Sequence, residues 1–438
     1  MEHDYLSQPQ ENNMNEKLTP GKLTAIQTDG LRWTVGHVYE NSDFYREKFD
    51  ALGISPSDIR DISDIGRLPF TTADDLREGY PFPLLSVPSE QVVRIHSSSG
   101  TTGKRKIMAY TAEDIRDWRE FFSRCYRMAG VGSGSRVQIA VGYGLWTAGA
   151  GFQAACEHAG AMAIPVGPGN IDMQCRFLLD LQPDVLCCTA SMALLMSEEI
   201  KKRGIRDRIN LKTIIQGSER CSEAMRCAIL ENSGAEHLYD ITGMTEIYGP
   251  GTGIDCHLHQ GIHYWNDYFI FEFLDPDTLE PVRDGEIGEI VVTTLRKQAS
   301  PLIRYRTRDL TRKISGECGC GSPFPRHDRI LGRSDDMIIF RGVNIYPGQI
   351  DEILSDIAVS YPISSEFDIN LRHEEGRDIM LIRVERAPDG DSGQDQEIEE
   401  FISKTIRNSL IVSPEIRVVD YGALPRSERK SKRIYDNR

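Results

Sequence analysis

One eight-residue stretch of hydroxyl, glycine and lysine residues constrains this chain more than any other segment. It reads Ser97-Ser98-Ser99-Gly100-Thr101-Thr102-Gly103-Lys104 and follows a short apolar run, 92–95, that predicts a strand. These residues make a poor core but a good phosphate site, because glycines let backbone N–H groups turn inward, hydroxyls donate hydrogen bonds and lysine supplies positive charge. The spacing is not that of the common P-loop, and a Ser/Gly-rich linker is the alternative interpretation.

The size and charge of the chain limit the classes of protein that it can belong to. Its 438 residues predict more than one domain, and its net charge of −15 argues against a general nucleic-acid-binding protein. An anionic substrate must therefore be held by local cations. No apolar run approaches the ~20 residues that a membrane span needs, and the polar, acidic N-terminus does not resemble a signal or transit peptide. We expect a cytoplasmic protein with no membrane or nucleic-acid partner.

Strand-like and helix-like segments alternate from about residue 137 to residue 241. This alternation predicts a mainly parallel sheet covered by helices, whose ligands bind beyond the carboxyl ends of the strands. Gly217 and the segment 240–243 fall at such ends. The pattern then becomes more antiparallel, and roughly the last hundred residues have an α+β pattern. We expect an α/β protein with a large domain (1–333), with mainly parallel sheets and an antiparallel or barrel-like part, and a small, mobile α+β domain (334–438).

Four further stretches have compositions as unusual as that of the Ser/Gly loop. Each one alone also fits an ion-paired strand, a turn or a basic tail. The stretches are 239–246, which ends a strand with Gly, Thr and Glu; 304–309, which places one acid among three arginines; 332–336, which leads into 341–344; and 424–430, near the C-terminus.

Together and in this order, the five stretches resemble the adenylate-forming superfamily of acyl-CoA synthetases, adenylation domains and luciferases. Within it they resemble the phenylacetate–CoA ligase family, and the resemblance extends from about residue 39 to residue 438. The segments that indicate this branch are 92–96, 249–251, 303–310 and 332–347. The resemblance implies a large AMP-binding domain followed by a small domain that moves about a hinge.

The resemblance also implies a role for individual residues. Ser98 to Lys104 would grip the ATP phosphates, Thr245 would contact the α-phosphate and Glu246 would help to hold Mg²⁺. Lys430 would serve the adenylation step, Asp335 would be the hinge and Gly342 would line a tunnel for CoA. The remaining nucleotide-binding residues would be Gly217, Ser218, Glu219, Tyr239 and Asp240 around the adenine, Asp309 on the ribose hydroxyls, and Arg333.

The chemistry of acid activation makes these residue types sensible. A carboxylate that attacks the α-phosphorus of ATP brings two anions together, so the transition state needs Mg²⁺ and a positioned cation. A carboxylate accepts two vicinal hydroxyls well, which suits Asp309 to a ribose. In the second step, the thiol must reach the acyl carbon from the side that the lysine occupied in the first step. A small domain on a hinge can present Lys430 first and a thiol tunnel second.

The chain departs from the usual family pattern at several positions. Arg429 replaces the usual Gly before Lys430, and Lys432 offers a second candidate amine. Ser218 replaces a usual Ala, and Trp146 replaces a usual Phe near the expected acyl pocket, so a specificity other than phenylacetate remains open. The residues expected to line that pocket as an apolar, aromatic slot are Tyr143, Trp146 and Tyr248.

Cys318 and Cys320 lie in a tight polar turn, where thiols have no packing role. Together with Cys256 and a histidine of the segment 257–263, they would complete a closed tetrahedral Zn²⁺ site. The family resemblance favours His263 over His257 or His259 as the fourth ligand. Surface or redox-active thiols are the alternative.

The leading functional hypothesis is an aryl- or arylacetyl-CoA ligase that uses ATP, Mg²⁺ and CoA and releases AMP and pyrophosphate. One alternative is an enzyme that loads the acyl group onto a carrier-protein thiol. Another is a nucleotide-binding relative without catalytic activity, against which the presence of Lys104, Glu246, Asp309 and Lys430 argues. The sequence does not identify the acid. By analogy with the family, we expect a homodimer.

Overall fold

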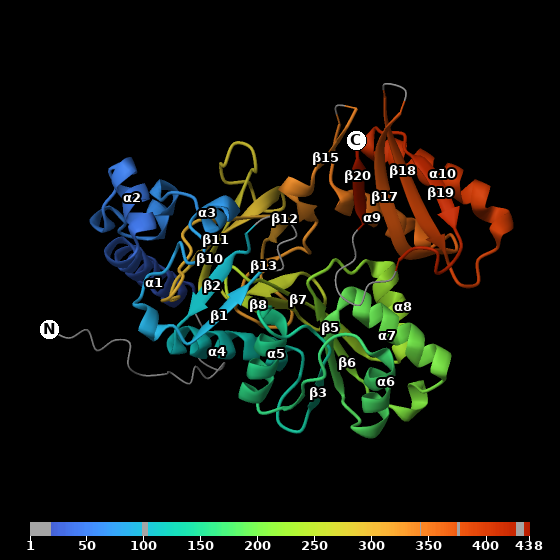
Figure 1. Cartoon of the computed structure of the whole chain (residues 1–438), viewed down its shortest axis with the longest axis horizontal. Helices are drawn as coiled ribbons and strands as arrows, with labels where there is room; N and C mark the ends of the chain where they lie inside the picture. Colours follow the sequence, from blue (N-terminus) through green and yellow to red (C-terminus); the bar gives the residue numbers. More distant parts are fainter. Residues whose placement is uncertain (1–18, 99–103, 342, 375–376, 426–432) are drawn as a thin grey trace.

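The computed structural model of this protein describes residues 19–98, 104–341, 343–374, 377–425 and 433–438 (Figure 1). Of the predicted site residues, Ser99 to Gly103, Gly342 and Lys430 lie outside these ranges, as do Arg429 and Lys432. Within the described ranges, no helix combines the length and the apolarity needed to cross a membrane.

The N-terminal part of the described chain is helical and leads into a short hairpin. Its helices are α1 (Pro20–Asn41), α2 (Asp43–Leu52) and α3 (Ala73–Glu78). Leu31, Val35 and Val38 recur at helical spacing on α1 and are fully buried. Strands β1 (Arg94–Ser97) and β2 (Ile107–Tyr110) pair antiparallel and are joined by the Ser/Gly loop.

A mainly parallel layer forms the middle of the large domain, as the alternating sequence predicts. Its strands are β3 (Arg136–Ile139), β4 (Met162–Ile164), β5 (Val185–Thr189), β6 (Thr213–Gly217) and β7 (His237–Met244), which pair in parallel in the order β4-β3-β5-β6-β7. The helices that cover it are α4 (Ala112–Met128), α5 (Thr147–His158), α6 (Ile171–Asp180), α7 (Ala190–Arg203) and α8 (Glu223–Ser233).

Strand β5 shows why this layer needs helices on both faces. All of its residues are buried, and successive side chains belong to different cores. Val185 and Cys187 pack in one hydrophobic cluster, whereas Leu186 and Cys188 pack in the other. A strand with two buried faces reads as a continuous apolar run, which is how this segment appears in the sequence.

The antiparallel part continues the same sheet, because β7 pairs antiparallel with β8. The strand order is β10-β11-β12-β13-β9-β8-β7, with β14 paired to β12. These strands are β8 (Gly249–Asp255), β9 (Ile262–Tyr264), β10 (Phe269–Leu274), β11 (Ile287–Thr294), β12 (Tyr305–Ile314), β13 (Arg326–His327) and β14 (Gly332–Arg333). The α/β class with a substantial antiparallel part is therefore confirmed.

The C-terminal part is a separate α+β unit with its own core, shown at the upper right of Figure 1. It contains the pair β15 (Ile338–Phe340) and β16 (Val343–Ile345), and a sheet of β17 (Ile363–Glu374), β18 (Arg377–Arg386), β19 (Glu415–Val419) and β20 (Ile434–Asn437) in the order β19-β18-β17-β20. Its helices are α9 (Pro347–Ala358) and α10 (Asp395–Leu410). The α+β architecture is confirmed, and the boundary at residues 333/334 remains a prediction.

Short 3₁₀ helices connect these elements. They are η1 (Pro56–Asp58), η2 (Ile62–Arg67), η3 (Ser89–Gln91), η4 (Arg206–Arg208), η5 (Ser334–Asp336) and η6 (Ser392–Gln394). The predicted hinge residue Asp335 lies in η5, between the large sheet and the C-terminal unit.

Candidate active site

The described ends of the Ser/Gly loop are fixed by backbone hydrogen bonds at the β1–β2 hairpin. The Ser97 N–H donates to Leu145 O at 2.8 Å, and the Ser98 N–H donates to Lys106 O at 3.1 Å. The Ser98 hydroxyl is buried without a hydrogen-bond partner among the described residues. Lys104 is exposed, and its Nζ lies 5.7 Å from the centre of the Tyr80 ring. A free hydroxyl and an exposed ammonium suit a loop that binds an external anion.

Thr245 and Glu246 lie in the turn between β7 and β8 and are 8% and 6% exposed. The Thr245 hydroxyl is 3.4 Å from the Thr147 hydroxyl, which joins this turn to the start of α5. The Glu246 carboxylate forms an ion pair with Lys106, and burial together with the charge of this carboxylate raises the pKa of the Tyr305 hydroxyl. Carboxylate and hydroxyl oxygens are ligands that Mg²⁺ accepts, so these two side chains fit the predicted metal ion. Glu246 would bind the ion after its ion pair with Lys106 breaks.

Lys297 is hydrogen-bonded to the backbone of the same turn. It was not among the predicted site residues. It is fully buried, and its Nζ donates to Ile247 O at 2.6 Å. The Tyr110 and Tyr248 rings flank the ammonium, with their centres 4.5 Å and 4.6 Å from Nζ. Burial lowers the pKa of Lys297 to about 7. Nothing in the spacing of the sequence distinguishes this lysine from a surface lysine, so only the fold reveals its position.

The predicted adenine-binding residues lie near the carboxyl end of β6 and in the neighbouring part of β7. The parallel register places Gly217 opposite Ile241, and Gln216 opposite Asp240. Gly217 has no room for a side chain, because a Cβ there would lie 2.4 Å from Ile241 O. Ser218 turns the chain away with a φ of 70°. The register therefore pairs Tyr239 and Asp240 with Ile215 and Gln216, immediately before the segment 217–219, and the adenine site remains a prediction.

Glu219 and Asp240 lie in different electrostatic surroundings. The Glu219 carboxylate accepts a hydrogen bond from the Ser191 N–H at 2.9 Å, near the start of α7. The Asp240 carboxyl is desolvated and close to the Asp255 carboxylate, and together these raise the pKa of Asp240 to about 7. Asp255 is in turn bonded to His259 Nδ1 at 2.6 Å. Asp240 is thus a carboxyl whose charge changes near neutral pH.

The raised pKa of Asp240 gives a prediction for stability. Its neutral form is favoured in the fold, so its contribution to stability is greatest at acid pH and is lost as pH rises through about 7. Asparagine stays neutral at every pH. We therefore expect Asp240→Asn to gain melting temperature relative to the parent protein as pH rises from about 4 to about 7, and to keep a constant advantage above about pH 7. Thermal unfolding of both proteins at several pH values measures this, and a difference that is constant with pH would contradict the assignment.

Asp309, Arg333 and Asp335 form one ion-paired group where β14 pairs with β12. Strands β12 and β14 pair Asp309 with Arg333, whose Nη1 lies 3.2 Å from Asp309 Oδ1. The same guanidinium donates two bonds of 2.9 Å to Asp335. Arg333 therefore links the predicted ribose-binding acid directly to the predicted hinge.

The three aromatic residues expected around the acyl group do not share one environment. Tyr143 and Trp146 lie between β3 and α5, and the residue that follows them, Thr147, contacts Thr245. Tyr248 is instead 1% exposed, and its ring packs against the core rings of Phe121 and Phe269. The structure therefore leaves Tyr143 and Trp146 as the aromatic candidates for the acyl pocket.

Cys256, His263, Cys318 and Cys320 converge although they come from two distant segments of the chain, the loop after β8 with strand β9 and the loop between β12 and β13. Their ligand atoms all lie within 4.8 Å of one another. Cys256 Sγ is 3.7 Å from Cys318 Sγ, and Cys320 Sγ is 3.4 Å from His263 Nε2. A tetrahedral zinc ion with Zn–S distances of ~2.3 Å separates its sulfurs by roughly 3.8 Å, so the site has the dimensions of a zinc site.

The ring orientation of the histidine agrees with this geometry. His263 Nδ1 lies 2.8 Å from Phe324 O, which leaves Nε2 free to face the sulfurs. His259 is bonded to Asp255 and stands outside this group. Among the three histidines considered, the structure brings only His263 to the cysteines.

Comparison with known protein families places this fold and site in one class. A family model described as "AMP-binding enzyme" matches residues 20–295. A second model, described as "AMP-binding enzyme C-terminal domain", matches residues 342–438. The fold is that of an AMP-binding enzyme with a C-terminal domain.

Relatives with known activity indicate one family within this class of AMP-binding enzymes. The chain is 38% identical to a phenylacetate-coenzyme A ligase of Escherichia coli, over 97% of this chain and 98% of that protein. It is also 38% identical to the phenylacetate-coenzyme A ligase of Thermus thermophilus, over 97% of this chain and 98% of that protein. The chain belongs to the phenylacetate-coenzyme A ligase family.

Solved structures of a 2-hydroxyisobutyryl-CoA ligase share the whole fold at 26% identity. The complex of that enzyme with its acyl-adenylate in the postadenylation state superimposes with a TM-score of 0.87, covering 95% of this chain and 90% of that one. The same enzyme with acyl-adenylate and CoA in the thioesterification state gives a TM-score of 0.70, covering 96% and 90%. The arrangement of the two parts seen here is closer to the first of these states.

Proposed function

We propose that this AMP-forming acid–CoA ligase activates an aromatic or arylacetic acid. In the first half-reaction the acid's carboxylate attacks the α-phosphorus of ATP, which forms an acyl-adenylate and expels pyrophosphate. In the second, the CoA thiol attacks the acyl carbon, which forms the thioester and expels AMP. The observation that carries this proposal is the 38% identity to phenylacetate-coenzyme A ligases over nearly the whole chain.

The turn at Thr245 and Glu246 is the proposed centre of the first half-reaction. A Mg²⁺ ion held by Glu246 would neutralise charge on the phosphates. The Thr245 hydroxyl would donate to the α-phosphate, and the Ser/Gly loop with Lys104 would hold the outgoing pyrophosphate. Lys297 keeps the turn in place through its bond to Ile247 O. Because the Thr245 hydroxyl is positioned by this turn before the reaction, it needs little reorganisation as negative charge develops.

The nucleotide is proposed to lie along the carboxyl edge of β6 and β7, with its ribose at Asp309. A carboxylate accepts both ribose hydroxyls. Arg333 shares its guanidinium between Asp309 and Asp335, so it orients the Asp309 carboxylate. Rotation at Asp335 would then exchange Lys430 for the CoA tunnel at Gly342.

Two alternatives remain testable and are less well supported. Transfer to a carrier-protein thiol would make AMP release depend on an added carrier, whereas transfer to CoA would not. A nucleotide-binding protein without catalysis would show no acid-dependent exchange between pyrophosphate and ATP. The acid–CoA ligases among the relatives favour CoA as the acceptor.

The identity of the acid is proposed from Tyr143 and Trp146, whose rings can pack against an aromatic substrate. Pyrophosphate release with phenylacetate, benzoate, substituted benzoates and short-chain acids tests this assignment. We expect an aromatic or arylacetic acid to give the highest kcat/KM. A preference for acetate or another short aliphatic acid would contradict the proposed substrate class, although the enzyme would still be an acid–CoA ligase.

We further propose that Cys256, His263, Cys318 and Cys320 bind one structural zinc ion. Four protein ligands leave no position open for substrate, which distinguishes a structural site from a catalytic one. The ion would tie the loop after β8 to the loop between β12 and β13. Cytoplasmic location and a homodimeric state are additional proposals, and light scattering of the purified protein tests the second.

The zinc proposal predicts the effect of Cys318→Ser. We expect loss of the metal and a lower melting temperature, because the metal ties two loops together in the folded state. Activity should fall only as far as folding does. Metal analysis of protein purified without chelator measures the zinc content directly, and a content far below one equivalent in the parent protein would contradict the site. The matched variant His259→Ala should keep its zinc.

A further inference from the structure

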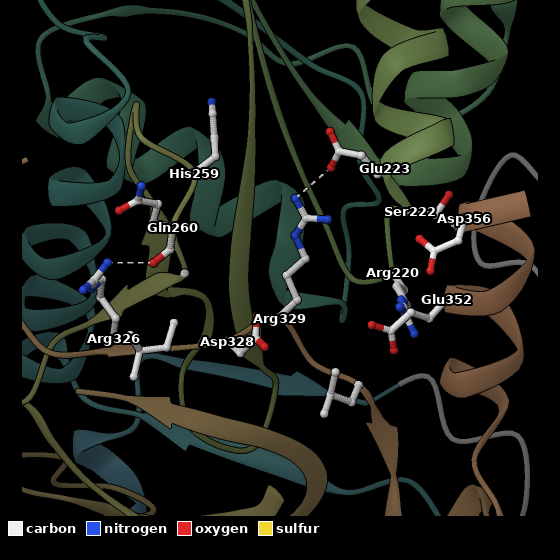
Figure 2. Close-up of a pocket in the computed structure, with 14 residues that line it drawn as sticks. Arg220, Ser222, Glu223, His259, Gln260, Arg326, Asp328, Arg329, Glu352 and Asp356 are labelled. Carbon is white, nitrogen blue, oxygen red and sulfur yellow. Dashed lines mark hydrogen bonds and ion pairs between the residues drawn. The ribbon is translucent and has the colours of Figure 1, made fainter. Parts of the chain in front are cut away.

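A cavity of about 600 Å³ separates the large domain from helix α9 of the small domain (Figure 2). Its lining comes from the start of α8, the loop before β9, the segment around β13 and β14, and α9. Beside this cavity, one arginine of the large domain, Arg220, contacts α9 directly. Arg220 follows the predicted adenine-binding segment 217–219 but has no role in the proposed chemistry.

Arg220 makes two polar contacts to the small domain. Its Nε lies 3.0 Å from Asp351 Oδ2, and its Nη1 donates to Gly348 O. Asp351 is 9% exposed, and within its own domain it lies 3.6 Å from Arg433. A largely buried carboxylate depends on its cationic partners more than an exposed one does. Asp351 thus has one arginine partner in each domain.

Gly348 brings the backbones of the two parts unusually close together. A Cβ on Gly348 would lie 1.6 Å from Leu331 O and 2.8 Å from Arg220 Nη1. No side chain fits at this distance, and a backbone carbonyl on one side leaves no flexible atom that could move away. This arrangement of α9 against the large domain therefore requires glycine at position 348.

These contacts join residues on opposite sides of the predicted hinge at Asp335. Rotation about that hinge would separate Arg220 and Leu331 from Gly348 and Asp351. The arrangement seen here matches the postadenylation complexes, with a TM-score of 0.87, better than the thioesterification complex, with 0.70. The contacts thus belong to an arrangement close to the one in which the adenylate has been formed.

We propose that Arg220, Gly348 and Asp351 are positioning residues that hold the small domain in the orientation used for adenylate formation. The contacts would break before each thioesterification step. None of the three residues would touch the reacting atoms. The proposal rests on the proposed two-step function, because it assigns these residues to one half-reaction only.

The kinetic test measures the two half-reactions separately in Arg220→Met and Asp351→Asn. Acid-dependent exchange of pyrophosphate into ATP reports the first, and thioester formation from a supplied acyl-adenylate and CoA reports the second. We expect the first to slow by about tenfold, equivalent to about 1.4 kcal/mol, while the second is unchanged or faster. Equal slowing of both half-reactions would indicate a merely structural role and overturn the proposal. Unchanged rates of both would overturn it as well.

Two further variants sharpen the test. In the double variant Arg220→Met with Asp351→Asn, we expect the first half-reaction to be no slower than in the slower of the two single variants, because both changes remove the same contact, whereas two independent losses of stability would add. Gly348→Ala should slow the first half-reaction more than Arg220→Met, because its Cβ cannot fit in this orientation. Gly36→Ala is the matched control, since a Cβ at that helical position meets nothing within 4 Å. Losses that add in the double variant would overturn the specific pairing.

A measurement that needs no activity separates this proposal from the proposed function. Small-angle X-ray scattering of the nucleotide-free protein should differ between Gly348→Ala and the parent, and should be the same for Gly36→Ala and the parent. Superimposable profiles for Gly348→Ala and the parent would overturn the proposed role of the contacts. A parent protein inactive with every acid tested would instead overturn the proposed function, and scattering would still decide the orientation.

Discussion

Lys430→Ala is expected to abolish adenylate formation while thioester formation from a supplied acyl-adenylate stays largely intact. The lysine side chain would stabilise charge only in the first transition state, where a carboxylate approaches the α-phosphate. Loss of one such donor typically lowers the rate by on the order of 10²–10³. Exchange of pyrophosphate into ATP, compared with conversion of the acyl-adenylate to the thioester, measures the two effects.

Lys432→Ala is the control for this assignment, because Lys432 is the second candidate amine of the C-terminal segment. Both lysines lie outside the described residues. The family resemblance selects Lys430, although Arg429 precedes it in place of the usual Gly. The Lys432 variant should keep most of its exchange activity. If Lys432→Ala lost exchange and Lys430→Ala did not, the alignment of the C-terminal segment would be wrong.

Asp335→Pro is expected to leave the first half-reaction working and to block the second. The hinge must change its backbone angles between the two steps, whereas proline fixes φ near about −65°. Asp335 lies in the first turn of the short helix η5, where proline is tolerated best. The expected phenotype is accumulation of enzyme-bound acyl-adenylate with little thioester, which quenched single-turnover experiments detect.

Asp335→Ala separates the backbone effect from the loss of the ion pair. This variant removes the carboxylate that accepts two bonds of 2.9 Å from Arg333 but leaves the backbone free to rotate. We expect it to retain thioester formation. Equal loss of both half-reactions in Asp335→Pro would indicate misfolding, and full retention of both would remove Asp335 as the hinge.

Much of the large domain was predictable because local sequence and tertiary structure agree there. Strand β5 is a short apolar run between helical patterns, and it forms a strand with two buried faces. Gly217 falls at a strand end in the sequence and meets the neighbouring strand at Ile241 in the structure. In the sequence, Cys318 and Cys320 lie in a polar turn where thiols have no packing role, which indicated a metal site. The fold brings both of them to Cys256 and His263.

Other features depend on long-range packing that no local pattern encodes. Lys297 looks like a surface lysine in the sequence, yet it is fully buried between Tyr110 and Tyr248. Tyr248 follows the turn at Thr245 and Glu246 and was expected in the acyl pocket, but its ring packs in the core. The contact between Arg220 and α9 joins residues more than a hundred positions apart, and only the relative position of the two domains creates it.

The most direct test of the proposed activity is one reaction in which all products are counted. Purified enzyme would be incubated with ATP, Mg²⁺, CoA and phenylacetate, without any carrier protein, and AMP, pyrophosphate and acyl-CoA would be quantified together. We predict equal amounts of AMP, pyrophosphate and acyl-CoA. When either the acid or CoA is omitted, we predict that no AMP is formed over multiple turnovers. Pyrophosphate release without thioester in the presence of CoA, for phenylacetate and for every other acid tested, would contradict the assignment of this chain as an acid–CoA ligase.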